Sequence, residues 1–182
     1  MAELPFAATT PISVARVGLA AKNADALADY YRKVVGLSEL SRTDGTITLG
    51  AAERPLLVIR GDSAARPDDP RSAGLFHTAF LLPTRTDLGR WVKHAIEKRI
   101  PVDGASDHLV SEAFYLTDPE GNGIEIYADR ARLQWEWNGT SIKMATLPLD
   151  VQGLLRDLPA DVPAWQEMPG NSVIGHVHLR VG

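Results

Sequence analysis

The sequence predicts an α+β fold that contains two copies of one unit, in which a strand and a helix are followed by three further strands. Three observations support this prediction. Residues 11–37 and 73–100 repeat one pattern at a constant offset of 61 positions, which pairs Arg16 with His77. Each copy opens with an apolar run of strand length and continues with a helix that has one apolar stripe. Short strand-like runs then follow both helices.

The first unit spans about residues 11–62. It opens with the largely apolar strand 13–21, and the helix after this strand ends at Gly36. Residues 46–49 and 56–59 are the strand candidates that follow the helix. The apolar stripe of the helix comes from positions that recur at spacings of three and four, namely Leu27, Tyr30, Tyr31 and Val34.

The second unit spans about residues 73–128 and repeats this order. Its first strand is 75–82, and strands 113–117 and 123–127 follow the helix. Between these two strands lies Asp-Pro-Glu-Gly-Asn, whose residues preset or tolerate the backbone angles of a turn. The apolar stripe of the second helix consists of Leu88, Trp91, Val92 and Ile96.

The remaining third of the chain differs in character. Residues 129–171 contain three tryptophans and several prolines with little periodicity, which predicts an irregular linker with one short helix near 151–157. Residues 172–182 look like the opening strand of a further module. We therefore predict paired modules in 1–128, the linker, and an orphan strand of a truncated second domain in 172–182. The exposed edge of such a strand favours pairing, with a homodimer as one way to achieve it.

Composition excludes several classes of function. The absence of cysteine excludes disulfides, thiolate metal sites and cysteine nucleophiles. The formal net charge of -4 predicts no nucleic-acid partner and no membrane partner. No apolar run approaches the ~20 residues that span a bilayer, and the N-terminus lacks a secretory signal, so we expect a cytoplasmic location. No nucleophile elbow, phosphate loop or dinucleotide motif is found.

Several segments resemble the vicinal oxygen chelate superfamily, which includes glyoxalase I, bleomycin-resistance proteins and extradiol dioxygenases. The most specific is DPEGNGIEIY, residues 118–127, which resembles the turn before a strand that carries a metal-binding glutamate. Residues 107–116, 136–155 and 175–181 are similar to the N-terminal part of catechol 2,3-dioxygenase-like proteins. The resemblance implies a glyoxalase-like fold, in which the curved sheets of paired modules face each other around a cleft.

For extradiol enzymes the resemblance implies Fe(II) held by two histidines and one glutamate. The matching positions in the second module are His77 and Glu125. The first module has Arg16 and Val58 instead, and an arginine cannot bind a metal cation. An alternative is that Arg16 takes the place of the metal and forms an ion pair with Glu125. Because a third ligand is lacking, we expect residues 1–182 to show no ring cleavage with added Fe(II).

The motif GHVHL contains two histidines on one strand face, His176 and His178, which could bind adventitious metal. By resemblance, His176 matches the first metal ligand of a C-terminal pair of modules. Its partner ligands would then lie beyond Gly182. This match is the basis for predicting that the chain is the N-terminal part of a two-domain architecture.

Two further residues are candidates for catalysis. The resemblance places Tyr115 in the cleft, where its hydroxyl could bond a substrate oxygen. His108 lies near the region of the family's acid–base histidine, and its ordinary pKa range suits proton transfer. The alternatives are a half-buried strand tyrosine and a solvated loop histidine. His94 is expected on the solvated side of the second helix.

Two functions therefore compete. The first is metal-dependent extradiol ring cleavage, with Fe(II) as the expected metal and a small aromatic, catechol-type compound as substrate in aromatic catabolism. The second is a non-catalytic domain that binds a small molecule or supports another domain, as in the bleomycin-resistance type. Ligands at His77 and Glu125 favour the first function, whereas Arg16 and Val58 favour the second.

Overall fold

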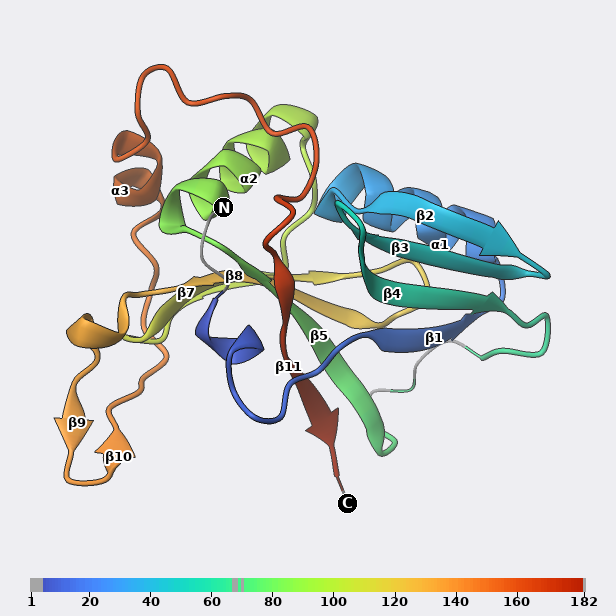
Figure 1. Cartoon of the computed structure of the whole chain (residues 1–182), viewed down its shortest axis with the longest axis horizontal. Helices are drawn as coiled ribbons and strands as arrows, with labels where there is room; N and C mark the ends of the chain where they lie inside the picture. Colours follow the sequence, from blue (N-terminus) through green and yellow to red (C-terminus); the bar gives the residue numbers. More distant parts are fainter. Residues whose placement is uncertain (1–4, 67–68, 70, 182) are drawn as a thin grey trace.

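The computed structural model describes residues 5–66, 69 and 71–181. Two β-sheets dominate the fold (Figure 1). One sheet has the strand order β1-β4-β3-β2, and the other has the order β11-β5-β8-β7-β6. The predicted α+β class is confirmed, and each unit shows a strand, a helix and three strands in sequence. The division into domains stays a prediction, and its bounds at residues 1 and 182 lie outside the described residues.

The first unit forms the four-stranded sheet, in which β1 runs parallel to β4 and the other neighbours are antiparallel. Its elements are β1 (Val17–Ala21), α1 (Ala24–Tyr30), a π-helical turn η2 (Tyr31–Val35), β2 (Ser38–Thr43), β3 (Thr46–Ala51) and β4 (Arg54–Gly61). The Asn23 side chain accepts a hydrogen bond from the Ala26 amide at the start of α1. Gly36 ends the helical segment with φ of 88°, a backbone conformation that favours glycine.

The second unit forms most of the five-stranded sheet. Its elements are β5 (Gly74–Leu82), α2 (Arg85–Lys98), β6 (Gly104–Asp107), β7 (Ser111–Thr117) and β8 (Gly123–Asp129). Thr84 caps α2 by accepting a hydrogen bond from the Asp87 amide. β5 and β8 are parallel, whereas β7 pairs antiparallel with both β8 and β6.

The segment expected to be an irregular linker contains several short elements. They are η3 (Arg132–Gln134), β9 (Trp137–Asn138), β10 (Ser141–Ile142) and α3 (Val151–Arg156), and a 3-10 helix η1 (Phe6–Ala8) lies near the N-terminus. The hairpin of β9 and β10 projects from the body of the protein (Figure 1). The predicted short helix corresponds to α3, which packs against α2.

The last strand, β11 (Val173–Arg180), differs from the predicted orphan strand. It pairs antiparallel with β5 from Val173 to Arg180, on the opposite side of β5 from β8. The physical reason is that β5 would otherwise leave a row of unpaired backbone groups at the sheet edge. The five-stranded sheet therefore includes a strand that lies more than 40 residues after the second unit in sequence.

The two units share one apolar core. Tyr31 and Leu57 from the first unit and Phe80, Trp91 and Ile126 from the second belong to one cluster of buried side chains. The indole of Trp91 is fully buried and donates a hydrogen bond to the Val34 carbonyl across the junction of the units. Burial of aromatic side chains on both sides makes the two units mutually dependent for stability.

The first unit also fixes the turn between β7 and β8. The Glu120 carboxylate accepts hydrogen bonds from the backbone amides of Lys22 and Asn23, at 2.9 and 2.8 Å. The buried Tyr31 hydroxyl donates to the Asp118 carboxylate, which also accepts from the Glu120 amide. Because β7 and β8 both end at this turn, its attachment to the first unit positions the strands on either side.

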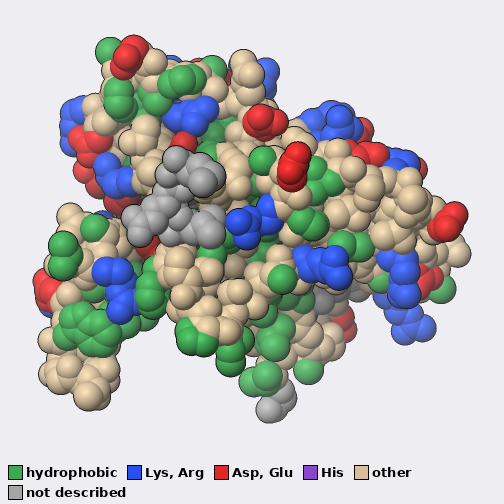
Figure 2. Space-filling view, in the orientation of Figure 1, with side chains coloured by type: hydrophobic (Ala, Val, Ile, Leu, Met, Phe, Trp, Pro, Cys, Tyr) green, Lys and Arg blue, Asp and Glu red, His purple; other side chains and the backbone are tan. Residues whose placement is uncertain are grey.

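Charged side chains of both signs are interspersed over the face of the protein seen in Figure 2. No helix in the described part of the chain is both long and apolar enough to cross a membrane.

Gly123 provides a test of the close packing between β5 and β8. An added Cβ would lie 2.1 Å from the Phe76 carbonyl oxygen, so Gly123→Ala is expected to lower the free energy of unfolding by about 2–3 kcal/mol. Gly104 has open space around the corresponding position, so Gly104→Ala should change it by less than about 1 kcal/mol. Urea denaturation measures both values. Equal effects of the two substitutions would contradict the close contact.

Candidate metal centre

Three neighbouring strands bring two imidazoles and one carboxylate together. His77 lies on β5, Glu125 on β8 and His176 on β11. The Nε2 atoms of His77 and His176 lie 2.9 and 3.1 Å from Oε2 of Glu125, and they are 3.3 Å from each other. His77 and Glu125 are buried, whereas the His176 side chain is 46% exposed. The cluster therefore has one side open to solvent.

The donor atoms fit a divalent transition metal. Metal–ligand bonds to nitrogen and oxygen measure about 2.0–2.1 Å, so two ligands at right angles lie about 3.0 Å apart and two tetrahedral ligands about 3.4 Å apart. The separations of 2.9, 3.1 and 3.3 Å fall in this range. Two histidines and one carboxylate are also the donor set of the facial triad of non-haem Fe(II) sites.

The electrostatics keep Glu125 in the form that binds a cation. Burial by itself would raise the pKa of this carboxyl, but hydrogen bonds from His176 and His77 outweigh that effect and lower its pKa to about 2. The side chain is only 3% exposed. A buried carboxylate needs such partners because an unpaired buried charge is very unfavourable.

The structure corrects two predictions about this cluster. Arg16 does not take the place of a metal: it is exposed, it precedes β1, and it lines another cavity beside Arg54. The expectation of a missing third ligand is also wrong, because His176 of this same chain meets Glu125. The physical reason is that β11 pairs with β5, and this pairing places His176 opposite Ala79, close to His77.

A cavity of about 870 Å³ opens over the cluster. Its described lining comes from the second unit, β11 and the segment around Met144 and Thr146, and none of it from the first unit. The cavity therefore lies on one face of the five-stranded sheet. The cleft between the two facing units, which the family resemblance implied, is not the place where these side chains converge.

Tyr115 and His108 meet at the wall of this cavity. His108 Nδ1 lies 2.9 Å from the Ala145 carbonyl oxygen, and its Nε2 lies 2.7 Å from the Tyr115 hydroxyl. Because a carbonyl only accepts, Nδ1 carries the proton, and in the neutral ring Nε2 accepts from Tyr115. Burial, with a smaller contribution from the Glu125 charge, raises the pKa of Tyr115 to about 12, so the hydroxyl stays protonated at neutral pH.

Two other histidines separate clearly. The His178 ring lies 5.0 Å from the His77 ring, measured between centroids, and it lines the cavity. His94 lies on α2, where its Nε2 is 3.2 Å from the Lys33 carbonyl oxygen, and it is absent from the cavity wall. His176 was the residue misplaced by sequence reasoning. The GHVHL motif signalled its ligand character, but nothing local indicated that its partners are in this chain.

A segment of the linker closes one side of the cavity. Leu147 and Asp107 exchange backbone hydrogen bonds of 2.9 Å in both directions. Arg130 holds the Asp107 carboxylate with two hydrogen bonds, at 2.6 and 2.8 Å. These contacts keep Ala145, and through its carbonyl the His108 ring, in position.

Asp129 lies at the end of β8 and adds a second perturbed carboxyl to this region. Burial raises its pKa to about 6, although His176 and Arg132 act in the opposite direction. This carboxyl therefore changes charge just below neutral pH.

A chain of paired strand–helix–strand units with a two-histidine, one-carboxylate cluster defines the class: an α+β protein with a candidate metal centre in a small-molecule cavity. This chain belongs to the Glyoxalase/Bleomycin resistance protein/Dioxygenase superfamily, whose family model matches residues 13–126.

Three comparisons illustrate the relationship. The chain is 41% identical over 155 residues to catechol-2,3-dioxygenase of Bacillus subtilis (strain 168), covering 84% of this chain and 53% of the relative. It is 28% identical over 121 residues to biphenyl-2,3-diol 1,2-dioxygenase 2 of Rhodococcus globerulus, covering 63% and 62%. The chain thus spans about half the length of the first relative. A glyoxalase/dioxygenase from Nostoc punctiforme has the same fold, with a TM-score of 0.56, 21% identity and coverage of 65% and 92%.

Metal binding is expected to require His176. Zn(II) or Co(II) at about 100 times the dissociation constant should stabilise the wild-type protein by about 2.7 kcal/mol. His176→Ala, which removes one donor from a partly exposed position, should lower the affinity at least about tenfold. His94→Ala is the matched control because His94 lies outside the cavity. Isothermal titration calorimetry of the metal-free protein measures the affinities, and unchanged binding by His176→Ala would contradict the site.

The raised pKa of Asp129 predicts how stability depends on pH. Because its pKa rises from 3.8 in the unfolded chain to about 6 in the folded protein, this group favours folding most at low pH. Its contribution is lost as pH rises through about 6. Asp129→Asn should therefore gain up to about 3 kcal/mol relative to the wild type between pH 4 and 7, measured by urea denaturation. A difference that stays constant over this range would rule out the raised pKa.

Proposed function

We propose that this chain holds Fe(II) with His77, Glu125 and His176 and carries out extradiol cleavage of a catechol-type aromatic compound. The observation that carries the proposal is the convergence of these three donors at the floor of a cavity. The similarity to a catechol-2,3-dioxygenase supports it at the level of the family. Fe(II) bound there would supply adjacent open positions for the two catechol oxygens and for dioxygen.

The residues of the chain would bind the substrate and handle its proton. Tyr115 lies on β7, and its ring centroid is 5.8 Å from that of His77. Its neutral hydroxyl can accept a hydrogen bond from a substrate hydroxyl while it donates to Nε2 of His108. A proton that leaves the substrate can therefore pass through the Tyr115 oxygen to Nε2 of His108. The Ala145 carbonyl then stabilises the resulting imidazolium through Nδ1–H.

The cavity suits a small aromatic ligand in size and lining. Its volume of about 870 Å³ lies within the range of small-molecule pockets. Phe76 and Ile124 provide apolar surface, whereas Ser106 and Thr146 add polar groups. Met144 covers part of the cavity, which would limit the access of water to the reacting atoms.

One observation favours a second candidate function, a non-catalytic small-molecule-binding or support domain. The first unit supplies no donor to the cluster and no described residue to the cavity wall. Its described role is to attach the turn before β8 through Glu120 and Tyr31. Homodimerisation, the cytoplasmic location and the absence of nucleic-acid partners stay predictions in either case.

Ring cleavage by the purified chain tests the proposed function. After anaerobic loading with Fe(II), addition of catechol and dioxygen should produce the yellow ring-opened product, recorded by absorbance. Tyr115→Phe and His108→Gln should each lower kcat by about 100-fold because they interrupt the proton path. Neither should change metal affinity by more than about threefold, because neither residue belongs to the donor set.

His94→Gln is the control for a histidine substitution outside the cavity, and its kcat should equal that of the wild type. Metal binding without turnover of catechols would contradict catalysis and favour the non-catalytic function. Turnover that persists unchanged in Tyr115→Phe would contradict the proton path alone.

A further inference from the structure

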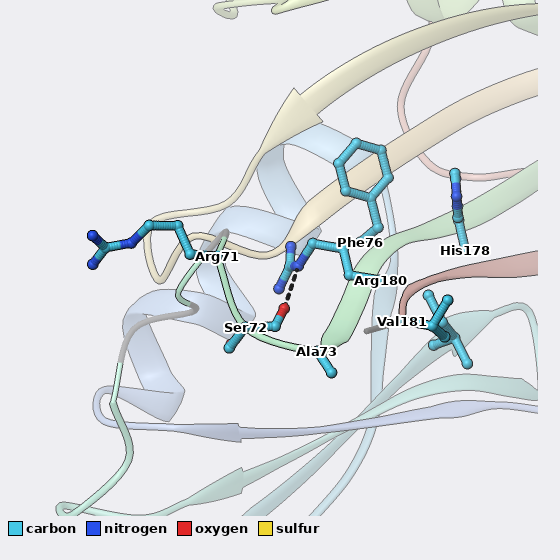
Figure 3. A pocket seen from close by; sticks show the side chains of 8 residues that line it. Arg71, Ser72, Ala73, Phe76, His178, Arg180 and Val181 are labelled. Carbon is cyan, nitrogen blue, oxygen red and sulfur yellow. Dashed lines mark hydrogen bonds between the residues drawn. The ribbon is translucent and has the colours of Figure 1, made fainter.

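A second, outer cavity adjoins the candidate metal centre. Its volume is about 410 Å³, and Figure 3 shows the side chains that line it. Phe76, His178 and Arg180 line both this cavity and the larger one over the metal centre. The two cavities therefore share a wall of three side chains, and a ligand bound at the centre can extend past them.

The shared wall follows from the register of β11. Side chains at alternate positions of a strand lie on one face and are about 7 Å apart along it. His176, His178 and Arg180 occupy three such positions in order. His178 pairs with His77 in the register, and Arg180 pairs with Gly74 near the start of β5. One strand thus supplies a metal donor and, farther along, two groups with N–H donors.

Charge is distributed unevenly along the combined cavity. No acidic side chain lines the outer cavity within the described part of the chain, whereas Arg71 and Arg180 both line it. The acidic residues of the inner cavity are Glu125, held between the imidazoles, and Asp103, which accepts a hydrogen bond from Thr117 at 2.7 Å. An anionic group is therefore favoured at the outer end by Coulomb attraction.

Arg180 is the arginine that faces the shared wall. Its Nε donates to the Ser72 carbonyl oxygen at 3.0 Å, which uses one of its five N–H donors and fixes the direction of the guanidinium. Arg71 extends away from Phe76, His178 and Arg180 in Figure 3, and its side chain is 90% exposed and paired with Asp69. Recognition is therefore assigned to Arg180, with Arg71 outside it.

Phe76 connects the two ends of the combined cavity. Its ring lies 5.3 Å from the His77 ring and 4.8 Å from the His178 ring, measured between centroids. It is 47% exposed, which is unusual for a phenylalanine beside a polar cluster. An aromatic ring bound between the metal centre and Arg180 would cover this exposed surface.

We propose that the outer cavity is a carboxylate subsite, and that the substrate is a catechol with a carboxylate on a short side chain. This inference rests on the proposed function. The diol would face the cluster of His77, Glu125 and His176, the ring would lie against Phe76, and the carboxylate would bind Arg180 with a further hydrogen bond from His178. A planar guanidinium suits a carboxylate because it can donate two parallel hydrogen bonds.

Substrate preference tests the subsite in the Fe(II)-loaded protein. 3,4-Dihydroxyphenylacetate should have a KM at least about tenfold lower than 4-ethylcatechol, which has a similar size and no charge. Arg180→Gln should remove this preference by raising the KM of the acid at least about tenfold, with less than about a twofold change for the neutral compound. Arg180→Lys should restore part of the preference, because it keeps the charge without the planar fork.

Arg71→Gln is the matched control, since it removes the same charge from the same cavity at a side chain that points away. Its KM for the acid should change by less than about threefold. Equal losses in Arg71→Gln and Arg180→Gln would overturn the subsite and indicate a general effect of charge. Equal KM values of the wild type for the two catechols would overturn it as well.

A binding experiment separates failure of the subsite from failure of the proposed function. Calorimetry on the metal-free protein compares 4-hydroxyphenylacetate with 4-ethylphenol, neither of which needs catalysis to bind. Tighter binding of the acid, lost in Arg180→Gln, supports the subsite even if no catechol is cleaved. Absence of this preference overturns the subsite even if catechols are cleaved.

Discussion

The arrangement of the whole second sheet depends on one buried carboxylate. Glu125 is ionised inside the protein, and the energy of burying its charge is offset by the imidazoles of His77 and His176 on the two nearest donor positions. Because these three side chains come from β8, β5 and β11, the same interaction that stabilises the carboxylate also joins three strands. A bound divalent cation would strengthen this link, so metal binding and the docking of β11 are expected to favour each other.

The first unit supports this arrangement without entering it. Its helix contributes Tyr31 to the common core, and the hydroxyl of the same residue reaches Asp118 in the turn before β8. Glu120 of that turn is bound in return by two amides at the start of α1. Since Glu125 lies only a few residues beyond the turn, the first unit fixes where its carboxylate stands. A repeated unit that carries Arg16 and Val58 in place of donors can therefore remain necessary to the site.

The cavity is organised outward from the carboxylate. Next to the donors stand Tyr115 and His108, whose protonation states are set by burial and by the Ala145 carbonyl. The linker segment that carries Ala145 is in turn fastened through Asp107 and Arg130. At the far end β11 presents His178 and Arg180. Each group acts at a definite position because strands and backbone hydrogen bonds hold it there, which is the condition for orienting a small substrate.

The sequence by itself determined the local elements and most of the chemistry. Periodicity and capping residues located the strands and helices of both units, and the turn at residues 118–122 pointed to Glu125, as the apolar strand did to His77. The sequence did not determine which strand borders β5. The pairing of residues about 100 positions apart depends on the burial and hydrogen bonding of a completed sheet, and no local pattern contains that information. Only the tertiary structure decided that His176 joins the two donors from the second unit, and that Arg16 lies elsewhere.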